Sequence, residues 1–198
     1  MQGIKILIIS LIATFVLSKT TDLKPLNNFN DKFEYLPIIT SNIYADLLII
    51  LITFSKILGK DKSWDILTFW YKKYRLSAMI ADILAGVLYL LVSRYIDHYY
   101  NLKLDLFKFT ILSVIVQIIL DYSFYLFFTA VPKGQNNMLD LFKDWAKYAK
   151  LDAIWGDSIL IIVGVILSAI LNKQSFDTNI VVLILGLYLT PYFIHMKD

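Results

Sequence analysis

The chain has 198 residues, of which 58% are hydrophobic and only 18% charged. This composition excludes an ordinary soluble domain, in which about a quarter of the residues carry charge. The net charge of +3 is small and is divided among several loops, so it does not indicate nucleic-acid binding. With no cysteine and only His98 and His195, the sequence offers no disulfide and no thiolate or histidine metal centre, and we expect no cofactor.

Apolar segments recur along the chain at the length needed to cross a bilayer, roughly 15–25 residues for about 30 Å of hydrocarbon. In chain order they are 6–18, 38–58, 76–96, 107–131, 153–171 and 179–195. Segment 6–18 is short and follows Lys5, so it is read either as a short N-terminal span or as a signal-like segment. We therefore predict an all-α integral membrane protein with five or six transmembrane helices in a single membrane domain, residues 1–198.

Two shorter segments, 63–75 and 138–150, have apolar residues on one helical face and charged residues on the other. At 13 residues neither can span a bilayer, so we expect both to be interfacial amphipathic helices. Trp70 and Trp145 fall on their apolar faces and are the expected anchors at headgroup depth.

Lysine and arginine are concentrated on one side of the predicted spans, mainly within 56–75 and 133–150. The side richer in basic residues faces the cytoplasm in most membrane proteins. We therefore expect the basic loops and both termini to be cytoplasmic.

The sequence matches itself when it is shifted by 75 residues. Asp46 then aligns with Asp121, Asp82 with Asp157, and Trp70 with Trp145. Aligned aspartates and tryptophans inside apolar sequence indicate a duplicated membrane unit. We predict a parallel tandem repeat in which 41–96 and 116–171 each contain a span, an amphipathic helix and a second span, followed by an extra C-terminal span at 179–195.

Four predicted spans carry one aspartate each: Asp46, Asp82, Asp121 and Asp157. An aspartate near the bilayer centre costs about 2.5–3.5 kcal/mol, so such acids face protein or water. Asn42 and Gln117 lie one helical turn before Asp46 and Asp121 and are expected hydrogen-bond partners. Lysines and arginines sit only near the span ends, so pairing of these acids with basic side chains is scarce.

Two functions fit this pattern. One is a mid-membrane acidic site, formed by these aspartates with Asn42 and Gln117, that passes or couples protons or small cations. The alternative is a structural or assembly protein of a viral or organelle membrane, with the aspartates as interhelical hydrogen-bond glue. The expected partner is the lipid bilayer; self-association into a homo-oligomer is left open.

An enzyme is not expected, because no P-loop, GxSxG, HExxH or dinucleotide-binding motif occurs. Intramembrane aspartyl proteases also carry two membrane aspartates, in Tyr-Asp and Gly-x-Gly-Asp motifs. Here Ile154 replaces the first glycine before Asp157, and Ala45 separates Tyr44 from Asp46. The protease interpretation is therefore set aside.

The segment GQNNMLDLFKDWAKYAKLDAIWGDSILI, residues 134–161, resembles uncharacterised small polytopic membrane proteins of large double-stranded DNA viruses. The resemblance covers about one repeat and contains no motif of known chemistry. It implies a virion or host-membrane location and transfers no catalytic residue.

Overall fold

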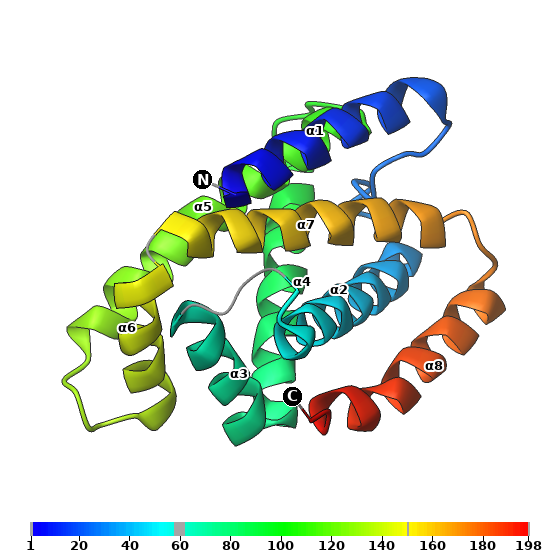
Figure 1. Ribbon diagram of the computed structural model, residues 1–198. Coiled ribbons are helices and arrows are strands. Elements are labelled where there is room, and N and C mark those ends of the chain that lie inside the picture. Colours follow the sequence, from blue (N-terminus) through cyan, green and yellow to red (C-terminus); the bar gives the residue numbers. More distant parts are fainter. Residues whose placement is uncertain (1, 58–61, 150, 198) are drawn as a thin grey trace.

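The computed structural model describes residues 2–57, 62–149 and 151–197, and every helix and turn within these ranges belongs to an all-α arrangement without strands (Figure 1). Within these ranges, six helices are long and apolar enough to cross a membrane. They are α1 (Gln2–Thr20), α2 (Tyr35–Ser55), α4 (Leu76–Tyr99), α5 (Leu106–Ala130), α7 (Leu151–Leu171) and α8 (Phe176–Ile194). The predicted all-α membrane fold is therefore confirmed.

In the part of the chain that the structure describes, three shorter helices connect the long ones: η1 (Lys32–Glu34), α3 (Lys62–Tyr74) and α6 (Asn137–Ala149). The helices α3 and α6 lie where amphipathic helices were predicted. Residues 58 and 150, the last positions of the predicted segments 38–58 and 138–150, lie outside the described residues. The first predicted span, 6–18, is part of the longer helix α1, which packs against α5 and α7.

Two of the long helices begin at a side-chain cap. Asp105 precedes α5, and its carboxylate accepts a hydrogen bond from the backbone N–H of Lys108 at 2.9 Å. Ser175 precedes α8, and its hydroxyl accepts from the N–H of Thr178 at 3.1 Å. Each cap satisfies one of the donors that the first turn of a helix leaves unpaired. The helices α5 and α8 thus begin directly after polar residues that mark the ends of the apolar segments.

Helix α7 lies at the centre of the bundle, between α1 and α2 (Figure 1). It also packs against α5 and α4, while α2 packs against α4 and α8. The short helices α3 and α6 contact each other. A spanning helix, a short helix and a second spanning helix therefore follow one another twice along the chain. The short helix of the first series contacts the short helix of the second.

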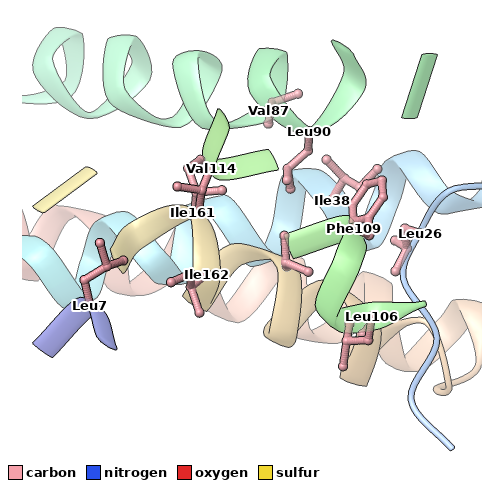
Figure 2. Close-up of a cluster of buried hydrophobic side chains, with 12 residues drawn as sticks. Leu7, Leu26, Ile38, Val87, Leu90, Leu106, Phe109, Val114, Ile161 and Ile162 are labelled. Carbon is pink, nitrogen blue, oxygen red and sulfur yellow. The ribbon is translucent and has the colours of Figure 1, made fainter. Parts of the chain in front are cut away.

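Two hydrophobic clusters fill the bundle. The first joins α1, α2, α4, α5 and α7 through residues that include Leu7, Ile38, Leu90, Phe109 and Ile162 (Figure 2). The second joins α2, α3, α4 and α8 through residues that include Ile50, Trp70, Met79 and Ile194. Because lipid tails are as apolar as leucine, such packing holds helices together mainly through close van der Waals contact.

The end of α4 farthest from α3 carries a buried cation. The side chain of Arg94 is fully buried, and its Nη2 lies 2.9 Å from Oε2 of Glu34. The same nitrogen donates to the carbonyl oxygens of Asn28 at 2.7 Å and Asp31 at 3.2 Å. Arg94 therefore fixes the segment before α2 to the end of α4, and its positive charge is paired with the Glu34 carboxylate.

Close packing of α4 against α2 depends on a glycine. A Cβ atom added at Gly86 would lie 2.1 Å from Oδ1 of Asn42, far inside van der Waals contact. The Asn42 side chain is held in this place by a hydrogen bond from its Nδ2 to the carbonyl oxygen of Ile38, at 2.8 Å. The amide therefore occupies the space that a side chain on α4 would need.

Gly86→Ala is expected to destabilise the protein by about 1–3 kcal/mol, because Asn42 must leave its rotamer and lose its bond to Ile38. Gly156→Ala on α7 is the matched control, since nothing lies within 4 Å of its added Cβ; better helix propensity should make it neutral or slightly stabilising. Thermal unfolding in detergent measures both. An equal effect of the two substitutions would contradict the tight α2–α4 contact.

Candidate functional site

The four predicted aspartates lie on four different spanning helices and form one group, named here the acid cluster: Asp46 on α2, Asp82 on α4, Asp121 on α5 and Asp157 on α7. Asp82 and Asp157 are each the seventh residue of their helices. Asp46 lies near the middle of α2 and is only 4% exposed, while the other three are partly exposed. The cluster thus lies in the half of the bundle that also carries α3 and α6.

Asp46 and Asp82 are joined by a tyrosine of the short helix α3. The hydroxyl oxygen of Tyr71 lies 3.0 Å from Oδ1 of Asp46 and 2.8 Å from Oδ2 of Asp82. The indole N–H of Trp70 donates to the same Oδ2 of Asp82 at 3.1 Å. Tyr71 is 1% exposed. One turn of α3 therefore reaches into the bundle and connects the acids of α2 and α4.

Asp121 and Asp157 contact each other directly, with their carboxyl groups within hydrogen-bonding distance. Asp121 has two further partners. The hydroxyl of Tyr89 on α4 donates to its Oδ1 at 2.5 Å, and Nε2 of Gln117 donates to its Oδ2. The hydroxyl of Ser158 on α7 contacts Oε1 of the buried Gln117 at 2.7 Å, which orients the amide.

The two acid pairs are close enough to interact. Asp157 lies within electrostatic reach of Asp82, and Tyr89 lies within reach of Asp82, Asp121 and Asp157. The polar contacts therefore run from Asp46 through Tyr71 to Asp82, and from Asp157 through Asp121 to Tyr89 and Gln117. They cross the boundary between the first half of the chain and the second.

The two amides predicted as partners behave differently. Gln117 makes the predicted hydrogen bond to Asp121, one turn away on α5. Asn42 instead donates to the carbonyl oxygen of Ile38 on its own helix, because its side chain turns toward Gly86 and Gly164 at the α2–α4–α7 crossing. Asn42 is thus a packing residue beside the acid cluster, and its predicted bond to Asp46 is wrong.

The two tryptophans also differ. Trp70 is 3% exposed, packs against Phe142 of α6 with ring centroids 4.8 Å apart, and donates to Asp82. Trp70 is therefore a hydrogen-bond partner of the acid cluster in the protein interior. The sequence predicted it only as an interfacial anchor and did not predict this contact. Trp145 is half-buried and meets Phe142 edge-on at 6.5 Å.

Sequence reasoning missed Tyr71 and Tyr89 as partners of the acids. Tyr71 stands on the apolar face of the 63–75 segment, where the helical period predicts burial but not which group the hydroxyl reaches. Tyr89 lies two turns after Asp82 on α4, on the face that meets α5. A signal existed, since a buried tyrosine needs a partner for its hydroxyl.

The chemistry available in the acid cluster is that of protonated and ionised oxygens connected by hydrogen bonds. Within the described residues, no group of three or more histidine, aspartate or glutamate side chains is placed to hold a metal ion. Arg94, the fully buried cation, is paired with Glu34 away from the cluster. Negative charge on these acids is therefore offset by hydroxyl, indole and amide donors.

Comparison with models of known protein families, with curated proteins and with solved structures found no match. What the protein does must therefore be inferred from the acid cluster and the helices that carry it.

Tyr71→Phe is expected to lower the free energy of unfolding by about 1–3 kcal/mol, because it leaves oxygens of Asp46 and Asp82 buried without their common partner. The matched control is Tyr125→Phe on α5, whose side chain is 44% exposed and should be neutral. Denaturation in detergent, followed by circular dichroism, measures both. Equal losses in the two variants would show that the Tyr71 bridge contributes nothing.

Proposed function

We propose that this polytopic membrane protein passes protons across its membrane, or couples their movement to another process, through the acid cluster. The observation that carries the proposal is the arrangement of four carboxyl groups from four spanning helices. Tyr71 bridges the first two, the other two contact each other, and Tyr89 donates to Asp121. Small monovalent cations are the wider class of substrate that such oxygens accept.

The cost of these acids supports a functional role. Each aspartate at this depth costs about 2.5–3.5 kcal/mol on the insertion scale, and the chain places four of them together. Proton movement needs groups that gain and lose protons and that contact one another through hydrogen bonds. The series Asp46–Tyr71–Asp82 provides such contacts at 3.0 and 2.8 Å.

A second candidate is a structural role, in the membrane of a virion or an organelle, in which the acids hold the bundle together. Its supporting observation is that Tyr71 and Trp70 bind α3 to Asp46 on α2 and Asp82 on α4. Interhelical hydrogen bonds in membranes are worth only about 0.6 kcal/mol on average. That small gain, set against the cost of four acids, favours the transport proposal.

We also propose that the two halves of the bundle are a tandem repeat and that α3 and α6 lie on the cytoplasmic side. The repeat is supported by paired contacts: α2 packs against α4 and α7, and the aligned α5 packs against α7 and α4. The orientation is supported by the lysines on and beside α3 and α6, because the positive-inside rule favours a cytoplasmic location for basic loops and, with six spans, for both termini.

Proton flux into liposomes containing the purified protein should exceed that of empty liposomes and should be abolished in the double variant Asp82→Asn/Asp157→Asn. Asparagine keeps the shape of the side chain but cannot exchange a proton at this site. A pH-sensitive dye, with proton and potassium gradients imposed in separate experiments, measures the flux and identifies the ion.

The control for this experiment is Asp144→Asn on α6, an exposed acid outside the acid cluster, which should leave flux unchanged. Potassium flux without proton flux would shift the substrate to a small cation. Absence of any flux from folded wild-type protein would exclude transport and leave the structural role.

The proposed orientation predicts opposite labelling of two single cysteines, which the cysteine-free chain allows without background. Gln174→Cys, in the exposed turn between α7 and α8, should react with a membrane-impermeant maleimide on intact cells. Gln135→Cys, in the exposed turn between α5 and α6, should react only after permeabilisation. The reverse pattern would place the basic loops outside.

A further inference from the structure

The Tyr71 hydroxyl contacts two carboxyl oxygens but has one proton to give. Its oxygen lies within hydrogen-bonding distance of both Asp46 Oδ1 and Asp82 Oδ2. Burial, together with the two neighbouring carboxyl groups, raises the pKa of Tyr71 well above its usual value, so the phenol keeps its proton. The phenol donates to one carboxyl, and the other contact requires a carboxyl O–H that donates to the phenol oxygen. One of the two aspartates is therefore protonated.

The surroundings of the two carboxyl groups distinguish them. Oδ2 of Asp82 faces both the Tyr71 hydroxyl and the indole N–H of Trp70, which is only ever a donor. Asp46 is 4% exposed, and its Oδ2 has no hydrogen-bond partner. A buried charge without donors costs far more than a buried neutral acid. The donors thus favour ionised Asp82, and the proton belongs on Asp46.

The hydrogen bonds of the second pair, Asp121 and Asp157, locate its proton in the same way. Two carboxyl groups in hydrogen-bond contact share one proton, since ionised carboxylates have no donor, and Asp121 and Asp157 are in such contact. Donors gather on Asp121, from Tyr89 on one oxygen and from Gln117 on the other. Asp121 is therefore the ionised member, and Asp157 carries the proton that it donates to Asp121.

We infer that the acid cluster is a binding site for two protons, held on Asp46 and Asp157, while Asp82 and Asp121 are ionised. In the first pair a balanced transfer is available: Asp46 gives its proton to the Tyr71 oxygen as Tyr71 gives its own to Asp82. The O–H bond on Asp46 breaks, one on Asp82 forms, and the negative charge moves from Asp82 to Asp46. The transport of these protons rests on the proposed function, whereas their location does not.

Asparagine substitution tests the assignment, because a carboxamide has one accepting oxygen and one donating nitrogen, like a protonated acid, whereas a carboxylate accepts on both of its oxygens. Asp46→Asn and Asp157→Asn should unfold within a few degrees of wild type. Asp121→Asn should lose clearly more than Asp157→Asn, because the donors Tyr89 and Gln117 face different oxygens of Asp121 and one of them would meet an amide nitrogen. Asp82→Asn keeps one oxygen that can accept from both Trp70 and Tyr71, so the proton of the first pair is assigned by the infrared bands. An equal or smaller loss in Asp121→Asn than in Asp157→Asn would overturn the assignment of the second pair.

Infrared spectroscopy locates the protons directly, through the C=O stretch of protonated carboxyl groups and its shift in heavy water. The difference between wild type and variant should show one such band lost in Asp46→Asn and one lost in Asp157→Asn. Asp82→Asn and Asp121→Asn should retain both bands. Bands lost at Asp82 or Asp121 instead, or no change in any variant, would overturn the inference.

Two further results keep this test separate from folding and from transport. If Asp82→Asn or Asp121→Asn does not fold, the double variant Asp46→Asn/Asp157→Asn decides alone: loss of both bands supports the assignment, and their persistence overturns it. Both bands present in a wild-type protein that shows no flux would exclude transport and leave the two bound protons.

Discussion

A carboxyl group surrounded by hydrocarbon must find donors or remain neutral, and this chain places four of them on four neighbouring helices. That constraint explains why the polar contacts of the bundle gather around the aspartates. The side chains that contact the aspartates or their partners come from four helices. They are Gln117 on α5, Ser158 on α7, Tyr89 on α4, and Tyr71 and Trp70 on α3. Helix packing in lipid has no strong hydrophobic drive of its own, so these contacts also determine which helix faces meet.

The two acid pairs satisfy the same constraint in different ways. In the first pair, α3 supplies a phenol and an indole from outside the spanning helices. In the second, the donors come from the spanning helices themselves, and the acids touch. An alanine stands at position 146, where the alignment of the halves would place a second tyrosine opposite Tyr71. The short helix α6 therefore cannot form the same bridge, and the two acid pairs of the cluster differ in their hydrogen-bond partners.

The long apolar helices and the position of each aspartate along its helix could be predicted from sequence, because length, apolarity and a lone acid in each apolar segment are local properties. The Gln117–Asp121 bond was predictable for the same reason, since both residues lie one turn apart on α5. The role of Tyr71 could not be predicted. An amphipathic period shows which face of α3 is buried, but not that the Tyr71 hydroxyl reaches acids on α2 and α4. Asn42 was misassigned because its neighbours, Gly86 and Gly164, come from helices far along the chain. Arg94 near the end of α4 looked like an ordinary flanking cation, yet burial beside Glu34 makes it part of the core.

Asp46 and Asp82 lie close in sequence to Tyr71, which bridges them, and this matters for how the protein is made. Asp46, Tyr71 and Asp82 are separated by 25 and 11 residues along the chain, so their hydrogen bonds can close before α5 is synthesised. The bond from Tyr44 to the carbonyl of Val182, by contrast, spans 138 residues and must wait for α8. Domains assemble from the N-terminus as they emerge from the ribosome. Asp46, which is only 4% exposed, can therefore enter the bilayer already paired, and the nascent protein does not have to keep it in water until the whole bundle is complete.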